Sequence, residues 1–294
     1  MIESLDSLLE QGHGVATTAQ LRTAGYSKKQ VAAAVAAKRL ERVIRGRFIA
    51  PGSQLTDVGV ARLAGGSLTG PSALPHHKLW TPHGSALTRH FRLTKKGAEL
   101  WERSAAGRRF GRAGDCIHVL YDTESNRFDD LIDGPVPALL ALAKCGGLDD
   151  VIAAIESFAR GGGDLEELRR LPQKPRRFAE ALDLATTTAD SGLESLARVR
   201  LQRLGIDVRA QVTCAGWPCD LVIGEWLVVE LDGFEFHSSR AALDRDLRKD
   251  RELVLAGYTI LRFSYNDVMR NWPACVEQIL AVVAAGWHAR SRAS

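Results

Sequence analysis

The sequence has little of what a secreted or membrane-embedded protein needs. Its longest apolar runs, such as residues 136–143, are far shorter than the stretch of about 20 residues that a helix needs to cross a bilayer. Residues 1–6 are acidic and have neither the cationic flank nor the apolar stretch of a signal peptide. These deficits exclude a membrane-spanning protein and predict a cytoplasmic location with no membrane partner.

Cysteine is scarce as well. The five cysteines are odd in number and scattered along the chain, which favours reduced thiols over a framework of disulfides. Cys214 and Cys219 lie close together, but no second cysteine pair and no nearby histidine completes a zinc set. The cysteine pattern therefore agrees with a reducing compartment and predicts no zinc site at these two residues.

The overall composition is that of a folded protein with more than one core. Of 294 residues, 45% are hydrophobic and 25% are charged, which excludes a mainly disordered chain. At about 100–200 residues per domain, this length predicts two or three compact units. We expect an α/β multi-domain protein with boundaries at residues 1–51, 52–190 and 191–294.

Positive charge is concentrated near the amino terminus. Between residues 20 and 50, eight cations face one acid, Glu41, so this local excess is larger than the net charge of +4 of the whole chain. Such a patch favours a polyanionic partner, because each cation that neutralises a phosphate releases a condensed counterion. The cations are Arg22, Lys28, Lys29, Lys38, Arg39, Arg42, Arg45 and Arg47.

The first fifty residues have the order of a winged helix-turn-helix. A short helix around Leu5 ends near Gly12, and two capping boxes, residues 17–20 and 27–30, open further helices to about residues 24 and 37. Residues 42–49 alternate around a glycine, as a two-stranded wing does. In this motif the start of the last helix touches base edges and the wing touches phosphates. The predicted DNA-binding residues are Lys28, Lys29, Gln30, Arg42, Arg45 and Arg47; a solvated basic face on a scaffold domain is the alternative.

Residues 14–51 carry motifs that are similar to the amino-terminal domain of AbiEi-type antitoxins from type IV toxin–antitoxin systems. These motifs are Thr17-x-x-Gln20-Leu21, Gly25-Tyr26-Ser27 and Arg45-Gly46-Arg47-Phe48, and the likeness continues through residues 70–73 to 79–80. The resemblance implies a winged helix that binds promoter DNA. It also implies a cognate toxin as a partner.

The middle of the chain is less informative. Residues 135–160 and 164–189 have the apolar spacing of helices, with glycine breaks between them. We expect residues 52–190 to form a mixed connecting domain that ends in a small helical bundle. The adjacent pair His76 and His77 has no further ligands nearby and is taken as structural.

The last hundred residues predict an α/β unit. A helix begins at residue 191, strands follow at 208–212, 218–223 and 226–231, a charged helix spans about 240–256, a strand spans 259–263, and an amphipathic helix spans about 267–284. Asp220 lies in one of these strands, and Glu230 and Asp232 lie in the next, two residues apart and therefore on one face. Three carboxylates repel one another unless a cation intervenes. We expect Asp220, Glu230 and Asp232 to bind Mg²⁺ or Mn²⁺ and to support phosphodiester hydrolysis.

The segment that follows these acids ends in His237, which is a candidate to move a proton to or from the reacting oxygens. The motifs Cys219-Asp220-Leu221, 228–233, 236–237, 244–250 and 257–263 resemble the endonuclease-like domain of very-short-patch-repair (Vsr) nucleases, which belong to the PD-(D/E)xK superfamily. The resemblance implies a restriction-endonuclease-like fold with Asp220 as central metal ligand and Glu230 and Asp232 as the acidic pair. It also implies that His237 is catalytic and that Glu194 helps to hold metal or water.

One position departs from this family. Where its members have a lysine two residues after the strand glutamate, this chain has Asp232, so the role of that lysine is vacant or passes to His237 or Lys249. The spacing of Lys249 from the aspartates of its own helix favours ion pairs within that helix. Glu194 has a structural alternative too, as the third helical residue of a capping box that opens at Ser191.

Two functions remain open at this stage. The first is a Mg²⁺-dependent endodeoxyribonuclease that docks on DNA through its winged helix. The second is a non-enzymatic, antitoxin-like transcriptional regulator whose nuclease fold has lost its activity, because folds outlive their functions.

Overall fold

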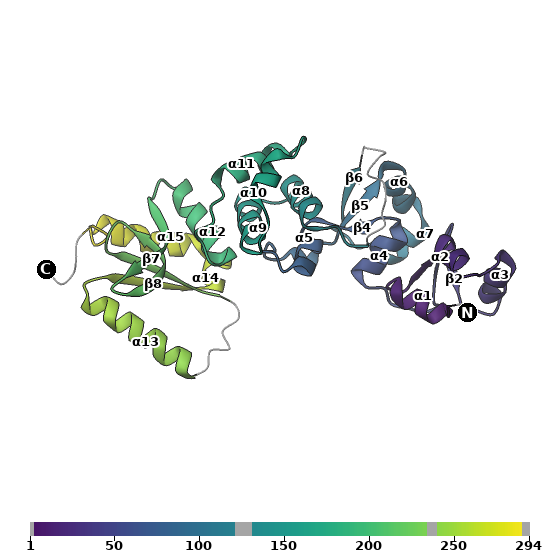
Figure 1. Ribbon diagram of the computed structural model, residues 1–294, viewed down its shortest axis with the longest axis horizontal. Helices are drawn as coiled ribbons and strands as arrows, with labels where there is room; N and C mark the ends of the chain where they lie inside the picture. Colours follow the sequence, from purple (N-terminus) through teal and green to yellow (C-terminus); the bar gives the residue numbers. More distant parts are fainter. Residues whose placement is uncertain (1–2, 121–130, 234–239, 290–294) are drawn as a thin grey trace. The chain divides into compact units, whose positions relative to one another are not determined.

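The structure is a computed structural model that describes residues 3–120, 131–233 and 240–289. The chain forms two compact units, Met1–Lys78 with Gly84–Leu142 and Leu79–His83 with Ala143–Ser294 (Figure 1). The finer division at residues 51 and 190 stays a proposal. Within the described residues, every helix is too short or too polar to cross a membrane.

The first unit opens with the predicted winged helix-turn-helix. Its elements are α1 (Leu5–Gln11), β1 (Val15–Thr17), α2 (Thr18–Thr23), α3 (Lys28–Ala36), β2 (Glu41–Ile44) and β3 (Arg47–Ile49). Both capping boxes form, with Thr17 and Ser27 accepting the amide of the third helical residue and a glutamine reaching back. The strand β1 was not predicted; it pairs antiparallel with β3 and gives a three-stranded sheet in the order β1-β3-β2.

The rest of the first unit is built around a second small sheet. It consists of α4 (Asp57–Ala64), β4 (Ser67–Leu68), α5 (Gly70–Ala73), the 3₁₀ turns η1 (Leu74–His77) and η2 (Ser85–Leu87), β5 (His90–Thr94), α6 (Lys95–Arg103), α7 (Ala105–Phe110) and β6 (Cys116–Leu120). The strands lie in the order β4-β5-β6, with β5 and β6 parallel. Phe91, Leu93 and Trp101 pack in the core beneath this sheet. None of these strands was predicted from the sequence.

Helices connect this sheet to the carboxy-terminal part of the chain. They are α8 (Pro135–Cys145), α9 (Leu148–Arg160), α10 (Leu165–Arg170), α11 (Arg176–Leu184) and α12 (Gly192–Arg203), and the first four match the predicted helical segments. A buried ion pair between Glu156 of α9 and Arg198 of α12 ties two of them together inside the second unit. The pair therefore joins the helices that precede residue 190 to the first helix of the carboxy-terminal part, within one compact unit.

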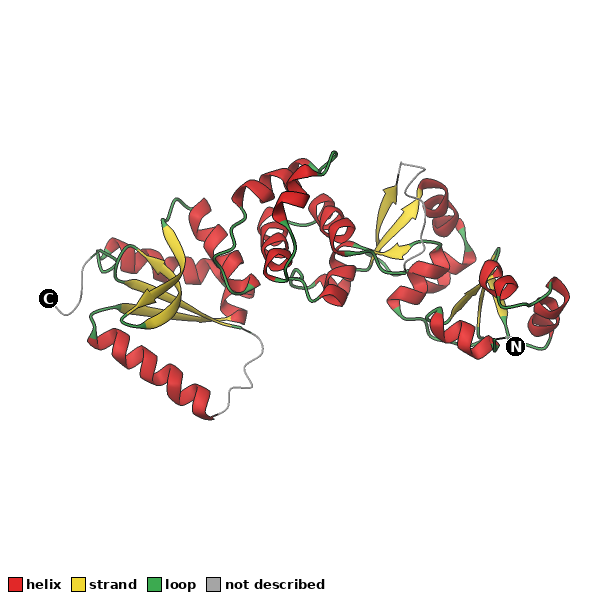
Figure 2. Ribbon diagram, in the orientation of Figure 1, coloured by secondary structure: helices red, strands yellow, loops and turns green. Residues whose placement is uncertain are grey.

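The carboxy-terminal part is a mixed four-stranded sheet between helices, which confirms the predicted α/β fold class. Its elements are β7 (Val208–Cys214), β8 (Trp217–Ile223), β9 (Leu227–Asp232), α13 (Arg240–Leu255), β10 (Thr259–Ser264), α14 (Tyr265–Arg270) and α15 (Trp272–Ala284). The strands lie in the order β10-β9-β8-β7, and only β10 runs parallel to its neighbour. Figure 2 shows α13 on one face of the sheet and α12, α14 and α15 on the other.

One prediction about this domain was wrong. The final amphipathic segment is two helices, α14 and α15, and not one. Pro273 occupies the second position of α15 and has no amide hydrogen to continue a preceding helix, so the chain turns at Asn271 and starts a new helix.

Candidate functional site

The strands β8 and β9 separate at Asp220. Their ladder runs from the pair Ile223–Leu227 to the pair Leu221–Val229. At the next position the amide of Leu231 in β9 donates to a side chain of β8 and not to a backbone carbonyl. The acceptor is Asp220 Oδ2, at 2.8 Å. The sheet therefore opens at this point with a carboxylate in the gap.

Glu230 lies beside this gap in the buried strand β9. Its side chain is 6% exposed, and one oxygen accepts a hydrogen bond of 2.6 Å from Lys249 Nζ of α13. The other oxygen, Oε1, is buried without a hydrogen-bond partner in the part of the chain that the structure describes. A buried carboxylate oxygen without a partner costs free energy, and such atoms gather where a ligand belongs.

The pKa of the Asp220 carboxyl is strongly raised. Burial, and then the negative charge of Glu230, raise the pKa of Asp220 from 3.8 to about 7. The charge of Glu194 acts in the same direction, while the Leu231 amide and Lys249 act against it. A group with a pKa this far from its ordinary value, beside a second acid, is typical of a site that holds a cation or moves a proton.

Glu194 joins these acids from α12, where it is almost fully buried. Ser191 caps the helix through the Glu194 amide, as predicted, but the Glu194 carboxylate does not return to the Ser191 amide. Its Oε2 instead accepts from the Asp190 amide at 2.9 Å and from Gln211 Nε2 at 2.8 Å. The predicted capping box is therefore confirmed for the Ser191 side chain and wrong for the Glu194 side chain.

Asp232 has a different environment from the other acids. Arg262 of β10 binds Asp232 at 2.9 Å and Asp250 of α13 at 2.8 Å. Across the described ranges, the potential metal-ligand atoms that gather within 4.8 Å of one another are those of histidines and cysteines, not those of Asp220, Glu230 and Asp232. The structure brings Asp220 and Glu230 together with Glu194, whereas Asp232 forms an ion pair with Arg262.

Lys249 was expected to pair within its own helix, and that expectation is wrong. Its ammonium reaches across to Glu230, while the helix's own (i, i+4) pair is Arg248 with Glu252. From the sequence, Lys249 was one candidate to replace the family's missing lysine, although its helical spacing favoured ion pairs with aspartates of its own helix. His237 lies outside the described residues.

The winged helix carries a cationic surface cavity of about 420 Å³ between α2, α3 and the β2–β3 hairpin. Its lining includes Arg22, Lys28 and Arg42, together with the aromatic side chains of Tyr26 and Phe48. Arg22 contributes to the basic patch but was not among the predicted DNA-binding residues. Only the fold, which lays α2 beside the wing, reveals its position.

The other predicted DNA-binding residues differ in how freely they can reach a partner. Lys29 and Arg45 are exposed. Gln30 is exposed too, but its side-chain oxygen accepts from both the amide and the hydroxyl of Ser27. Arg47 is partly buried, and burial lowers its pKa; its guanidinium lies against Gly65 at the end of α4.

Comparisons with known proteins agree with this layout. Residues 3–48 match a family model described as "Transcriptional regulator, AbiEi antitoxin", and residues 194–283 match the restriction endonuclease model REase_MTES_1575. A 53-residue segment is 43% identical to an uncharacterized protein of Haemophilus influenzae and covers 18% of this chain and 43% of that protein. The homing endonuclease I-Bth0305I catalytic domain aligns over 32% of this chain and 95% of its own length, with 22% identity and a TM-score of 0.28.

The chain therefore joins two kinds of domain. Its amino-terminal domain is similar to AbiEi-type transcriptional regulators, and its carboxy-terminal domain is similar to restriction endonucleases. Both resemblances that the sequence motifs suggested are confirmed at this level. The restriction-endonuclease match begins at Glu194 and spans Asp220, Glu230 and Lys249.

Proposed function

We propose that this protein is a DNA-binding endodeoxyribonuclease that depends on a divalent cation. The observation that carries the proposal is the meeting of Asp220 and Glu230 where β8 and β9 separate, inside a restriction-endonuclease-like domain. Glu230 is buried and Asp220 is partly buried, and one oxygen of Glu230 has no partner among the described residues. This arrangement has little value for stability and is suited to chemistry.

The donors at this point fit a hard cation. Oxygen ligands from carboxylates are those that Mg²⁺ and Mn²⁺ prefer, and the raised pKa of Asp220 reflects a local excess of negative charge that a cation would neutralise. Asp220 and Glu230 would hold the ion, with Asp232 as a further acid on the same strand as Glu230. Such an ion, when bound, lowers the pKa of a water and neutralises charge on a phosphate.

The chain's own residues supply the remaining roles. Lys249 holds Glu230 through one oxygen and leaves the other oxygen, which has no partner among the described residues, to bind the ion. Lys249 would also take the role of the family's lysine. Glu194, fixed by Gln211 and the Asp190 amide, adds negative charge and raises the affinity for a cation. His237 keeps its predicted role in proton transfer.

The winged helix would position the substrate. Phosphate contacts set the register of a protein on DNA, and a cavity lined by Arg22, Lys28 and Arg42 presents three cations to the backbone. Lys29 and Arg45, which are exposed, extend the same positive surface. Gln30 and Arg47 would contribute less, because the first serves its helix cap and the second is partly buried against Gly65.

Cleavage of supercoiled plasmid by the full chain tests the proposal. Wild-type protein with Mg²⁺ or Mn²⁺ should nick the plasmid, and EDTA should abolish the nicking. Asp220→Asn should be inactive. Asp207→Asn, which changes an exposed aspartate of the same unit, should retain full activity. Nicking that is equal in wild type and Asp220→Asn would show a contaminating nuclease and would refute the proposal, as would no nicking with either ion.

A second function is favoured by a different observation. The match of residues 3–48 to a transcriptional regulator supports an AbiEi-like repressor that binds promoter DNA and has a cognate toxin as its partner. In that case the carboxy-terminal domain only recognises a partner. Binding of the protein to its own promoter, with Asp220→Asn repressing as well as wild type and plasmid left intact by both, would favour this function over the nuclease.

A further inference from the structure

A second cluster of chemically active side chains lies in the first unit, whereas the acids belong to the second. The parallel strands β5 and β6 pair His90 directly with Cys116. His118 follows Cys116 by two residues, so the side chains of Cys116 and His118 leave the same face of the strand. The register therefore places two imidazoles and a thiol together at the start of these strands, although His90 and Cys116 are far apart in sequence.

The three side chains converge on one atom. His118 Nε2 lies 3.1 Å from His90 Nδ1 and 3.5 Å from Cys116 Sγ. An imidazole nitrogen carries either one proton or one lone pair, so it can form one good hydrogen bond and not two. A hydrogen bond from or to His118 Nε2 therefore explains its short distance to His90 Nδ1 or its short distance to Cys116 Sγ, but not both.

A metal ion explains both distances. In a tetrahedral zinc site, with Zn–N bonds of about 2.0–2.1 Å and a Zn–S bond of about 2.3 Å, two nitrogens lie about 3.3 Å apart and a nitrogen and a sulfur about 3.6 Å apart. The observed 3.1 Å and 3.5 Å are close to these values.

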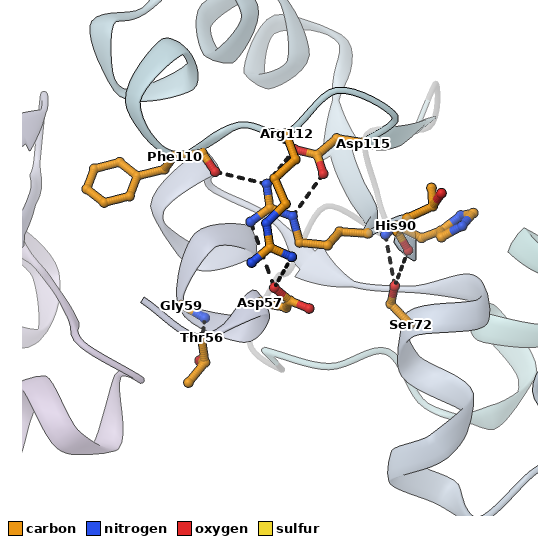
Figure 3. Close-up of polar contacts among 10 residues, drawn as sticks. Thr56, Asp57, Gly59, Ser72, His90, Phe110, Arg112 and Asp115 are labelled. Atoms are coloured by element: carbon orange, nitrogen blue, oxygen red, sulfur yellow. Dashed lines mark hydrogen bonds and ion pairs between the residues drawn. The ribbon is translucent and has the colours of Figure 1, made fainter. Parts of the chain in front are cut away.

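The backbone at this cluster is held by contacts that do not involve the cluster. Arg89 and Asp115, the residues just before His90 and Cys116, form a bidentate ion pair of 2.8 Å and 2.6 Å. The Cys116 amide also donates to the Arg89 carbonyl. In Figure 3, Ser72 Oγ accepts the His90 amide from below the strand. The ligand positions are therefore fixed before any ion arrives, as an effective metal site requires.

We propose that His90, Cys116 and His118 form a binding site for a zinc-type divalent transition metal. The imidazoles bind as neutral ligands and Cys116 as a thiolate, whose proton is released to solvent when the ion binds. The ion links β5 to β6, and water completes its coordination. The site is independent of the nuclease, whose acids are oxygen donors in the other unit.

Cobalt(II) titration of the full chain, stripped with chelator and then dialysed, tests the site. Cobalt bound to a thiolate absorbs in the near ultraviolet by charge transfer, whereas cobalt bound only to carboxylates does not. The wild type should show this band with one equivalent of Co²⁺, and Zn²⁺ should erase it. Cys116→Ser should remove most of the band, and His118→Ala should weaken Zn²⁺ binding by more than about tenfold, since losing a ligand costs at least as much as losing its supporting contact.

Two matched controls should leave the band unchanged: Cys275→Ser, a buried thiol of the other unit, and His76→Ala, an exposed histidine of the same unit. Circular dichroism establishes that each variant is folded. In the unaltered chain, Zn²⁺ should also slow alkylation of Cys116, read by mass spectrometry. A folded wild type that shows no band, or a band that survives Cys116→Ser, would overturn the proposal, and plasmid nicking would be unaffected by either result.

Discussion

Asp220 should lower the stability of the protein at neutral pH when no cation is bound, so Asp220→Asn should stabilise it. The pKa of Asp220 rises from 3.8 to about 7 on folding, because the folded state buries the carboxyl beside Glu230. An acid with a raised pKa favours the fold while it is protonated. Stability is therefore lost as the pH rises from about 4 through about 7, and the loss above pH 7 amounts to about 4 kcal/mol.

Asparagine removes this charge but keeps an oxygen that can accept the Leu231 amide. In EDTA, the gain in unfolding free energy of Asp220→Asn over wild type should therefore grow by about 2–3 kcal/mol between pH 5 and pH 8. Urea denaturation followed by tryptophan fluorescence measures it, since five of the six tryptophans lie in the second unit. Adding Mg²⁺ at pH 8 should stabilise the wild type and leave the variant unchanged.

Asp207→Asn, on the surface of the same unit, serves as the control and should follow the wild type at every pH. A difference between wild type and Asp220→Asn that stays constant from pH 5 to pH 8 would refute the reasoning. A variant less stable than the wild type at both pH values would do so as well, because it would show that the carboxylate stabilises the fold.

Three further outcomes follow from the contacts. Lys249→Met should destabilise the second unit by about 3–5 kcal/mol in urea denaturation, since it leaves Glu230 buried and charged, and adding Glu230→Gln should recover part of the loss. The double change Lys28→Ala and Lys29→Ala should reduce the slope of log K against log salt for DNA binding by about 2. Gly66→Ala should lower the unfolding free energy of the first unit by about 1–3 kcal/mol or more, because its new Cβ would lie 1.9 Å from a backbone oxygen of β5.

The last two outcomes have matched controls. Lys144→Ala removes an exposed lysine outside the winged helix and should leave the salt slope unchanged. Gly134→Ala adds a Cβ that meets no atom within 4 Å and should be close to neutral. An unchanged slope after the double lysine change would show that α3 does not face the phosphates. Equal stability of the two glycine variants would show that the backbone near Gly66 relaxes freely.

Local signals predicted the parts of the fold that are local. The capping boxes at Thr17 and Ser27 formed as their spacing required, and the alternating apolar residues located β8 and β9 and hence Asp220 and Glu230. The short strand β1 was missed because its three residues offer too little alternation to detect. What makes it a strand is its pairing with β3, more than thirty residues later.

Partnerships between distant residues could not be read from spacing. Lys249 has aspartates within one helical turn, yet it reaches Glu230 because α13 packs across the sheet. The pair of His90 with Cys116 depends on a parallel register between β5 and β6, which no local pattern encodes. Charge alone likewise could not separate Arg47, which is partly buried against Gly65, from the exposed Arg45.

The order of residues in the acidic site has a consequence during synthesis. Glu230 and Asp232 leave the ribosome before the basic groups that compensate them, since Lys249 lies in the following helix and Arg262 in the last strand. The winged helix, by contrast, is complete within the first fifty residues. The proposed DNA-binding surface is therefore complete well before the acids are neutralised and buried, and the proposed cleavage would have to wait until nearly the whole polypeptide has been made.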